Sequence, residues 1–202
     1  MMKIYTKAGD KGFTKLYSGE TVSKNDPLVK AYGKIDTLVS FLGFSKSLLA
    51  NKKKNSLFKS IIKDLEDLQI TCFKIMTDLS GTNMKNIERV TEKDIQKIES
   101  QIDNIWNNIE PLRNFVIPGH DVYSSSLHIA RSVCREIEPI LIEASNKYPI
   151  NPLVIKIINR ISDLLFSIAV LVDLSVNKKL SITKNNRKVT EENESKRNSR
   201  KK

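Results

Sequence analysis

The sequence predicts an all-α fold: a five-helix up-and-down bundle with a glycine-rich N-terminal loop and a disordered basic C-terminal tail. Five long segments repeat apolar residues at intervals of three and four, the period of a helix with one buried face. Short polar or proline-containing links join these segments, so neighbouring helices should run antiparallel. No strand pattern alternates with the helices, which argues against a parallel α/β sheet.

The chain of 202 residues suits one domain with a sizeable core, and 40% of it is hydrophobic. We expect residues 1–178 to form one helical domain, with residues 1–26 as its N-terminal loop, and residues 179–202 to form the tail. Residues 178–202 hold ten Lys or Arg against three Glu, so the remaining chain carries only +4 of the +11 net charge. The tail either contacts anionic surfaces nonspecifically or is simply solvated.

Cys72 and Cys134 fall inside helical apolar patterns, and their spacing suggests neither a zinc site nor a redox pair. Buried, reduced thiols are typical of a cytoplasmic protein. The glycine-rich loop leaves no room for a signal peptide, and charged residues interrupt even the most apolar helix. We therefore expect a cytoplasmic location and no membrane span.

Helix boundaries follow from local signals. The first helix should begin at Asp26-Pro27, a cap followed by the proline that the first helical position tolerates, and end before Lys52. The second should run from about Ser56 to Gly81, followed by a polar loop. Thr91 and Asp94 form a capping box that opens the third helix, which Pro111 closes.

A linker, Leu112 to His120, separates the third and fourth helices. It contains Phe115-Val116-Ile117-Pro118-Gly119, which is too apolar for a solvent loop and too rich in proline for a helix, so it should pack on something. The fourth helix should span about 121–147 and the fifth about 152–178.

The N-terminal loop, Thr6 to Thr14, has the composition of a polyphosphate-binding turn. Gly9 and Gly12 would let backbone N–H groups converge on an anion, and the lysines would add positive charge. Asp10 would hold Mg²⁺ or orient the lysines. The alternative is a β-turn with surface lysines. The glycine spacing fits neither a Walker motif nor a dinucleotide fingerprint.

Polar residues on the last two helices are the other candidates. Arg131, Arg135 and Glu138 share one helix face, where they suit a phosphate chain and a ribose hydroxyl, or form an exposed salt-bridge face. His128, one turn away, is expected to be a satisfied structural histidine. Asn159 would hydrogen-bond a ligand.

Two acids leave alternatives open. Asp163 would pair with an arginine of the fourth helix, or it would fix the register of the bundle. Asp36, on the first helix, would form a salt bridge across a subunit interface, or it would be a solvated carboxylate.

Six motifs, taken in order, resemble the PduO-type ATP:cob(I)alamin adenosyltransferases over Lys3 to Leu174. These motifs are Thr6 to Thr14, Lys24-Asn25-Asp26, Ala31 to Asp36, Asn114 to Gly119, Arg131 to Glu138 and Asn159 to Asp163. The resemblance implies transfer of the 5′-deoxyadenosyl group of ATP to Co(I) of reduced cobalamin, giving adenosylcobalamin and inorganic triphosphate. It also implies a homotrimer with active sites between subunits, Mg²⁺ bound with ATP, and a reductase and an adenosylcobalamin-dependent enzyme as further partners. No dedicated nucleic-acid or membrane partner is implied.

The resemblance also implies the site residues. Arg131 would pair with Asp36 of a neighbour, Phe115 would close the lower face of the corrin and displace its axial base, and Arg135 would act on the nucleotide. The nucleotide-binding residues would be Thr6, Lys7, Ala8, Gly9, Asp10, Gly12, Thr14, Lys24, Arg135, Glu138 and Asn159. No residue is assigned as a direct metal ligand, since Mg²⁺ comes with ATP and Asp10 is the one candidate to contact it.

Four residues depart from the family pattern: His120 stands where a second glycine is common, and Glu136, Pro139 and Val170 stand where arginines are common. Glu136 removes positive charge beside the nucleotide, and Pro139 should kink the fourth helix just beyond Glu138. The alternative function is therefore a catalytically weakened homologue that acts as an ATP- or cobalamin-binding carrier or sensor.

Overall fold

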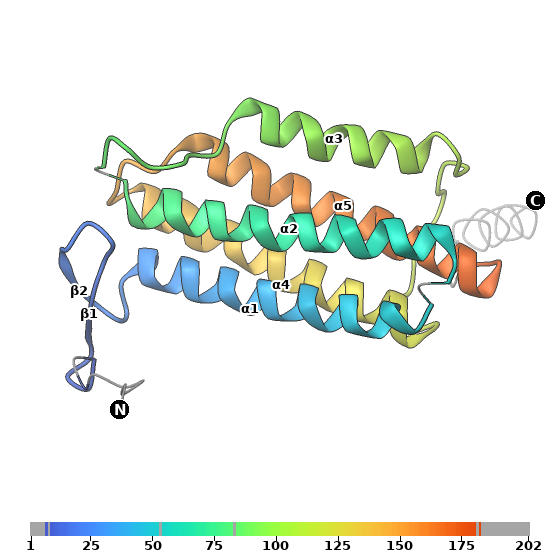
Figure 1. The fold of residues 1–202 in the computed structure, drawn as a ribbon, viewed down its shortest axis with the longest axis horizontal. Helices are drawn as coiled ribbons and strands as arrows, with labels where there is room; N and C mark the ends of the chain where they lie inside the picture. Colours follow the sequence, from blue (N-terminus) through green and yellow to red (C-terminus); the bar gives the residue numbers. More distant parts are fainter. Residues whose placement is uncertain (1–6, 8, 53, 83, 181, 183–202) are drawn as a thin grey trace, which may run out of the picture.

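The computed structural model of the chain describes residues 7, 9–52, 54–82, 84–180 and 182. Within these residues, five helices lie side by side, each antiparallel to the next along the chain (Figure 1). The helices are α1 (Pro27–Leu49), α2 (Ser56–Ser80), α3 (Glu92–Trp106), α4 (Val122–Ser145) and α5 (Pro152–Asn177). The predicted five-helix bundle is confirmed.

Three short elements complete the described fold. A 3₁₀ turn, η1 (Ala50–Lys52), links α1 to α2. Ahead of α1, strands β1 (Phe13–Lys15) and β2 (Thr21–Ser23) pair antiparallel, with Thr14 opposite Val22. The sequence did not predict this hairpin, because three-residue strands are too short to show an alternating pattern.

Side-chain caps set the helix starts as predicted. Asp26 accepts a hydrogen bond from the backbone N–H of Leu28 at 2.9 Å, which stabilises the start of α1 beside Pro27. Thr91 and Asp94 form the expected capping box at α3. These caps satisfy N–H groups that a helix leaves free at its first turn.

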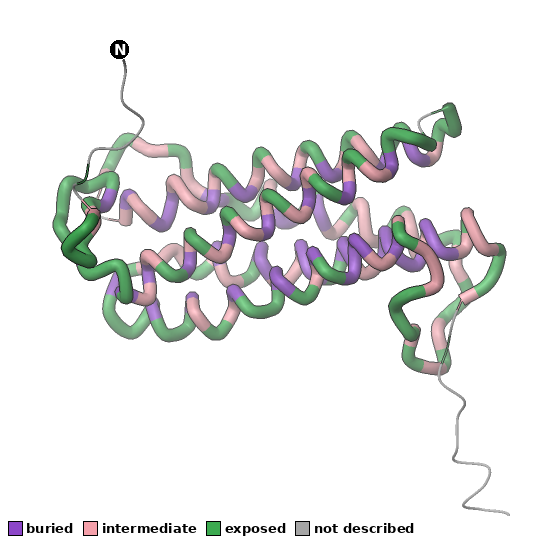
Figure 2. The backbone as a smooth tube through the Cα atoms, turned by 90° about the horizontal axis from the view of Figure 1, so that it is seen from below, coloured by how far each residue is buried: buried purple, intermediate pink, exposed green. Residues whose placement is uncertain are grey.

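The core lies between α4 and α5, with α1 packed on α4, α2 on α1, and α3 on α5. Buried residues follow the inward faces of the helices (Figure 2). α5 is buried on most of its circumference, which explains its near-continuous run of apolar residues. Cys72 and Cys134 are buried and free, as predicted, and burial raises the pKa of the Cys72 thiol to about 12.

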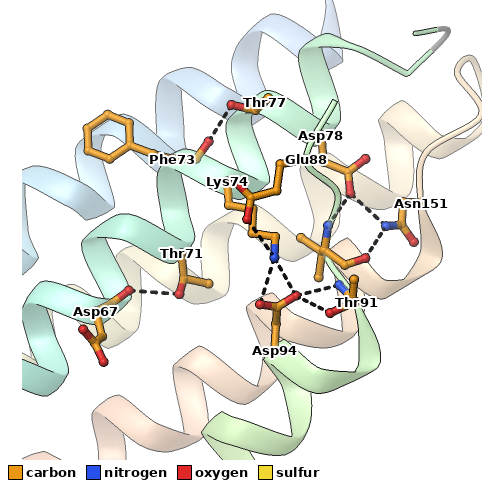
Figure 3. Close-up of polar contacts among 11 residues, drawn as sticks. Asp67, Thr71, Phe73, Lys74, Thr77, Asp78, Glu88, Thr91, Asp94 and Asn151 are labelled. Carbon is orange, nitrogen blue, oxygen red and sulfur yellow. Dashed lines mark hydrogen bonds and ion pairs between the residues drawn. The ribbon is translucent and has the colours of Figure 1, made fainter. Parts of the chain in front are cut away.

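A buried polar cluster joins α2, the polar loop after it and the start of α5. The carboxylate of Asp78 accepts hydrogen bonds from Arg89 Nη1 at 2.6 Å, the Val90 N–H at 2.9 Å and Asn151 Nδ2 at 2.8 Å. Close by, Lys74 contacts Asp94 at the start of α3 (Figure 3). Three segments that are distant in sequence are thereby fastened together.

The linker before α4 differs from its prediction. Val116 forms an antiparallel bridge with Ile182, but the Phe115 side chain is 83% exposed and Ile117 is 47% exposed. The expectation that the linker packs is met at Val116 and is wrong for Phe115 within one chain. Neighbouring side chains of an extended segment point to opposite sides, so pairing Val116 leaves its neighbours outward.

Further expectations concern Pro139, membrane spans and the C-terminal tail. α4 continues through Pro139 to Ser145, so the helix does not end at the proline, and the kink expected just beyond Glu138 stays a prediction. No helix in the described ranges is long and apolar enough to cross a bilayer. The tail, residues 179–202, lies almost entirely outside the described residues, so its disorder stays a prediction, as does the cytoplasmic location.

Candidate functional site

The N-terminal loop is built from tight backbone turns. The N–H of Gly12 donates to the carbonyl of Gly9 at 3.2 Å, and the N–H of Lys24 donates to the carbonyl of Gly12 at 2.8 Å. Gly12 has a φ of 80°, in the left-handed region that favours glycine. The hairpin thus brings Lys24 back to the glycines that precede it by more than ten residues.

Gly9 leaves room for Lys24. A Cβ atom at Gly9 would lie 2.7 Å from Lys24 Nζ, so the ammonium group lies directly against the glycine backbone. Two of the predicted triphosphate-binding residues therefore meet. Lys7, Asp10 and Lys24 are exposed, and Thr14 is half-buried. Thr6 and Ala8 lie outside the described residues.

A second group of predicted residues gathers where α4 packs on α5. Asn159 Nδ2 donates to Glu138 Oε1 at 3.0 Å, which joins the two helices. Arg131 and Arg135 lie on the same face of α4 as Glu138, about two turns and one turn earlier respectively. The proline after Glu138 leaves this contact intact.

The two arginines have no acidic partner in the part of the chain that the structure describes. Among the described residues neither forms an ion pair, and the Arg131 Nε is buried without a hydrogen-bond partner. Burial lowers the pKa of Arg131, and the nearby positive charge of Arg135 lowers it further. Two adjacent guanidinium groups without a counter-ion favour binding of an anion.

Asp36 likewise has no charged partner among the residues that the structure describes. It is exposed on α1 and makes no ion pair within the described part of the chain. Two residues earlier on α1, Lys34 Nζ lies 2.5 Å from Glu136 Oε2, so α1 and α4 are joined by a pair that the sequence did not predict. The departure at Glu136 therefore has a compensating cation in the same chain.

Asp163 does not pair with an arginine of α4, so that expectation is wrong. Its carboxylate lies 3.3 Å from Arg160 Nη1, and Arg160 Nε in turn lies 2.8 Å from Glu99 Oε1 on α3. α3 packs on this face of α5. Helical spacing gives the shared face but not which neighbour covers it.

His128 is buried, as expected of a structural residue, but it is not satisfied. Neither ring nitrogen has a hydrogen-bond partner among the described residues. Burial, with a smaller contribution from Arg131, lowers the pKa of His128 to about 4, so the ring is neutral near pH 7. The ring lies 6.1 Å from that of Phe166.

The predicted residues occupy different ends of the bundle. The hairpin lies where α1 begins, whereas the linker with Phe115 lies at the opposite end, where α4 begins (Figure 1). No hydrogen bond or ion pair between described residues joins the hairpin to Arg131, Arg135, Glu138 or Asn159. One chain therefore does not gather all of the predicted site residues in one place.

Comparison with known proteins identifies relatives of one kind. The family model described as cobalamin adenosyltransferase matches residues 4–172. A corrinoid adenosyltransferase of Citrobacter freundii is 36% identical over 170 residues, covering 84% of this chain and 94% of the relative. The corrinoid adenosyltransferase PduO of Salmonella typhimurium is 32% identical over 171 residues, covering 83% of this chain and 49% of the relative. The human corrinoid adenosyltransferase MMAB is 33% identical over 173 residues, covering 83% and 67%.

Solved structures agree with these relatives. A variant PduO-type ATP:corrinoid adenosyltransferase from Lactobacillus reuteri, complexed with cobalamin and ATP, superimposes with a TM-score of 0.82 at 31% identity, covering 91% of this chain and 97% of that chain. A second variant of that protein, complexed with ATP, gives a TM-score of 0.78 at 31% identity, covering 90% and 100%.

Proposed function

The chain belongs to the cobalamin adenosyltransferase family, and we propose that it transfers the 5′-deoxyadenosyl group of ATP to Co(I) of reduced cobalamin, releasing inorganic triphosphate. Its relatives are named corrinoid adenosyltransferases, and a similar structure holds cobalamin and ATP. The observation that carries the proposal is the pair of uncompensated arginines, Arg131 and Arg135, beside the joined Glu138 and Asn159.

The nucleotide site combines two parts. Arg135, Glu138 and Asn159 bind the nucleotide from the helices, with Arg135 neutralising phosphate charge. The N-terminal loop binds the triphosphate through Lys7, Gly9, Asp10, Gly12, Thr14 and Lys24, together with Thr6 and Ala8. The contact of Lys24 with Gly9 supports this role, because it holds positive charge against the glycine backbone of the loop.

Magnesium suits this loop. Asp10 is an exposed carboxylate among lysines and hydroxyls, and oxygen ligands are those that Mg²⁺ prefers. Bound with ATP, Mg²⁺ would neutralise charge on the triphosphate.

The chemistry needs alignment more than proton transfer. Co(I) supplies an electron pair to C5′ of ATP, a Co–C bond forms as the C5′–O bond breaks, and the triphosphate leaves with the bonding electrons. Stabilising that leaving group requires positive charge, which Arg135 and the loop lysines provide. His128 is buried and neutral, in keeping with a reaction that needs no general base.

We propose a homotrimer whose sites form between subunits. Among the described residues of the chain, Arg131 and Asp36 form no ion pair, which supports pairing between neighbouring copies. The separation of the hairpin from the Phe115 linker supports the same arrangement, since a second copy can supply the missing part (Figure 1). Phe115, exposed in the single chain, would contact the corrin. The reductase and the adenosylcobalamin-dependent enzyme stay predictions.

The weakened-homologue alternative loses part of its motivation. Glu136 and Pro139 motivated it, and the Lys34 ammonium lies 2.5 Å from the Glu136 carboxylate. The negative charge is therefore neutralised locally rather than directed at the nucleotide.

A spectroscopic assay tests the function. The full chain is incubated without oxygen with ATP, Mg²⁺ and chemically reduced cobalamin, and we expect the adenosylcobalamin spectrum with one triphosphate released per product. Replacing ATP by ADP controls for the leaving group. If ATP binds but neither product forms, the chain is a binding protein and the proposal is wrong.

A further inference from the structure

Four polar side chains meet where α4 begins and α5 ends. We call Asp121, Ser124, Asp173 and Asn177 the carboxylate cluster. Asp173 is completely buried on α5, and Asp121 is half-buried at the N-cap of α4. Two buried carboxylates at one point are unfavourable if both are charged.

Asp121 has the partners of a charged carboxylate. Its Oδ1 accepts from the N–H groups of Tyr123 at 2.7 Å and Ser124 at 2.9 Å, and its Oδ2 accepts from Asn177 Nδ2 at 2.7 Å and Ser124 Oγ at 3.2 Å. Burial alone would raise the pKa of Asp121, but these hydrogen bonds outweigh it and hold the pKa below its usual value.

Asp173 has the surroundings of a protonated acid. Its Oδ1 has only a 3.5 Å contact with Asn177, and its Oδ2 is buried without a partner among the described residues. Burial raises the pKa of Asp173, and the neighbouring Asp121 raises it further, while the Ser124 hydroxyl and His120 act in the opposite direction without outweighing them. A neutral Asp173 can donate its proton to the Asp121 carboxylate.

Few other charges face the cluster. His120 comes from the linker, and Lys52 of η1 lies 5.5 Å from the ring centroid of Tyr123, in the first turn of α4. From α5 itself, Asn177 contributes only a neutral amide. The charge on the two carboxylates, Asp121 and Asp173, therefore depends mainly on whether a proton is bound between them.

The cluster anchors the linker that carries Phe115. The linker enters α4 at Asp121, which the Asn177 amide ties to the end of α5. Further along the same side, Val116 pairs with Ile182, just beyond α5. The end of α5 thus holds the linker at two points.

We propose that Asp121 and Asp173 share a single proton, and that this proton fastens the Phe115 linker to α5, so that the linker loosens as the pH rises. Asp173 is then a positioning residue. The role of the linker in the reaction rests on the proposed function, but the shared proton and the anchoring can be measured without substrate.

The pH dependence has a definite sign. Because the folded chain raises the pKa of Asp173, this group favours folding at low pH, and the benefit is lost as the pH rises from 3.8 to the raised pKa. For each unit by which folding raises the pKa of Asp173, the folding equilibrium constant falls by about tenfold across that pH window. Asp121 acts oppositely: its benefit is lost only as the pH falls below 3.8.

The first experiment compares melting temperatures of the full chain and the Asp173→Asn variant at constant ionic strength from about pH 4 to about pH 9. Asparagine resembles the protonated acid, so the variant should lose less stability than the natural chain as the pH rises. Asp103→Asn, at an exposed position of α3, controls for the loss of one negative charge. If the melting temperatures of Asp173→Asn and the natural chain change with pH in the same way, the proposal is wrong.

A second variant guards against misfolding. Asp121→Asn keeps an oxygen acceptor for the N-cap and removes the other charge, so it should flatten the pH dependence as well. Combining both substitutions should flatten it no further, because one shared proton is lost only once. An additive effect of the two would also contradict the proposal.

The anchoring has its own readout. Backbone hydrogen exchange in residues 112–120 is measured for the natural chain and Asp173→Asn at equal pH. Exchange should match at low pH, and the natural chain should exchange faster at high pH. Equal exchange throughout would overturn the link to the linker. A chain that shows these differences but makes no adenosylcobalamin contradicts the proposed function and not this inference.

Discussion

Arg131 and Arg135 place two positive charges on one face of α4 without an acid in the described chain to balance them. Arg131 is half-buried, so its charge is only partly hydrated, and a ligand or a second subunit would relieve that cost. The exposed Arg135 needs no partner for folding. Its free guanidinium group is therefore better explained by binding than by stability.

We predict that Arg135→Ala lowers turnover by roughly two to three orders of magnitude, the effect typical of removing a group that stabilises transition-state charge. Its melting temperature should stay close to that of the natural chain, because the side chain is exposed. Steady-state kinetics and thermal denaturation measure the two effects. Lys59→Ala, an exposed cation on α2, is the matched control. Unfolding of Arg135→Ala, or full activity, would refute the assignment.

We predict that Phe115→Ala mainly slows the reaction that starts from cob(II)alamin. Displacing the lower axial ligand makes reduction to Co(I) easier, and that help is not needed once the cobalt is already reduced. The ring is 83% exposed, so stability should hardly change. Rates are compared from cob(II)alamin and from pre-reduced cobalamin, with Ile117→Ala as a control in the same linker. Equal slowing in both assays would contradict the role.

Helix packing depends on a few polar ties between elements. Asp78 is 1% exposed and holds donors from the polar loop and from the residue before α5 (Figure 3). Removing it would leave buried donors without an acceptor, which costs more than the hydrogen bonds contribute. The hydrogen bonds of Asp78 therefore help to position α2 against the start of α5.

We predict that Asp78→Ala destabilises the fold by about 3 kcal/mol, because it breaks a largely buried ion pair and strands its donors. Asp67→Ala is the control, since its pair with Lys97 is exposed and should be worth under about 1 kcal/mol. Urea denaturation of both variants gives the difference. Similar losses for the two would show that burial of Asp78 does not matter.

α1 and α4 are tied differently, through the exposed pair of Lys34 and Glu136. We predict that Glu136→Arg does not raise turnover, because the new arginine would face Lys34 as a like charge. Steady-state kinetics measure this, and Lys34→Glu combined with Glu136→Arg restores opposite charges as a control. The coupling between the two positions should stay under about 1 kcal/mol. A severalfold gain for Glu136→Arg would instead favour the weakened-homologue alternative.

For the whole molecule, the main feature is the distance between parts of one proposed site. The hairpin and the Phe115 linker lie at opposite ends of the bundle, and the helix residues lie between them (Figure 1). A rigid bundle cannot bring its two ends together, so we propose that a second copy of the chain completes the site.

We predict that Asp36→Arg and Arg131→Asp each disrupt assembly and turnover, and that combining them restores both in part, because the intersubunit pair is then reversed. Sedimentation velocity gives the assembly state, and the cobalamin assay gives turnover. Asp103→Arg controls for a charge reversal elsewhere. A natural chain that is monomeric and fully active would contradict the proposed trimer.

Much of the fold could be predicted because its signals are local. Asp26-Pro27 and the Thr91–Asp94 box fix helix starts within one turn of chain, and both are confirmed. The hairpin was missed because its pairing depends on turn geometry rather than on pattern. The partner of Asp163 was wrong because α3, a separate element, covers that face of α5.

The sequence by itself determined the five helices, their buried faces and the residue types of the proposed site, since helical period and capping act over a few residues. Only the tertiary structure decided which polar side chains meet: Glu138 with Asn159, Lys34 with Glu136, and Asp121 with Asp173 through Asn177. Such pairs depend on the rotation and axial position of each helix against its neighbour. Those quantities follow from how the whole core packs, and no short stretch of sequence contains them.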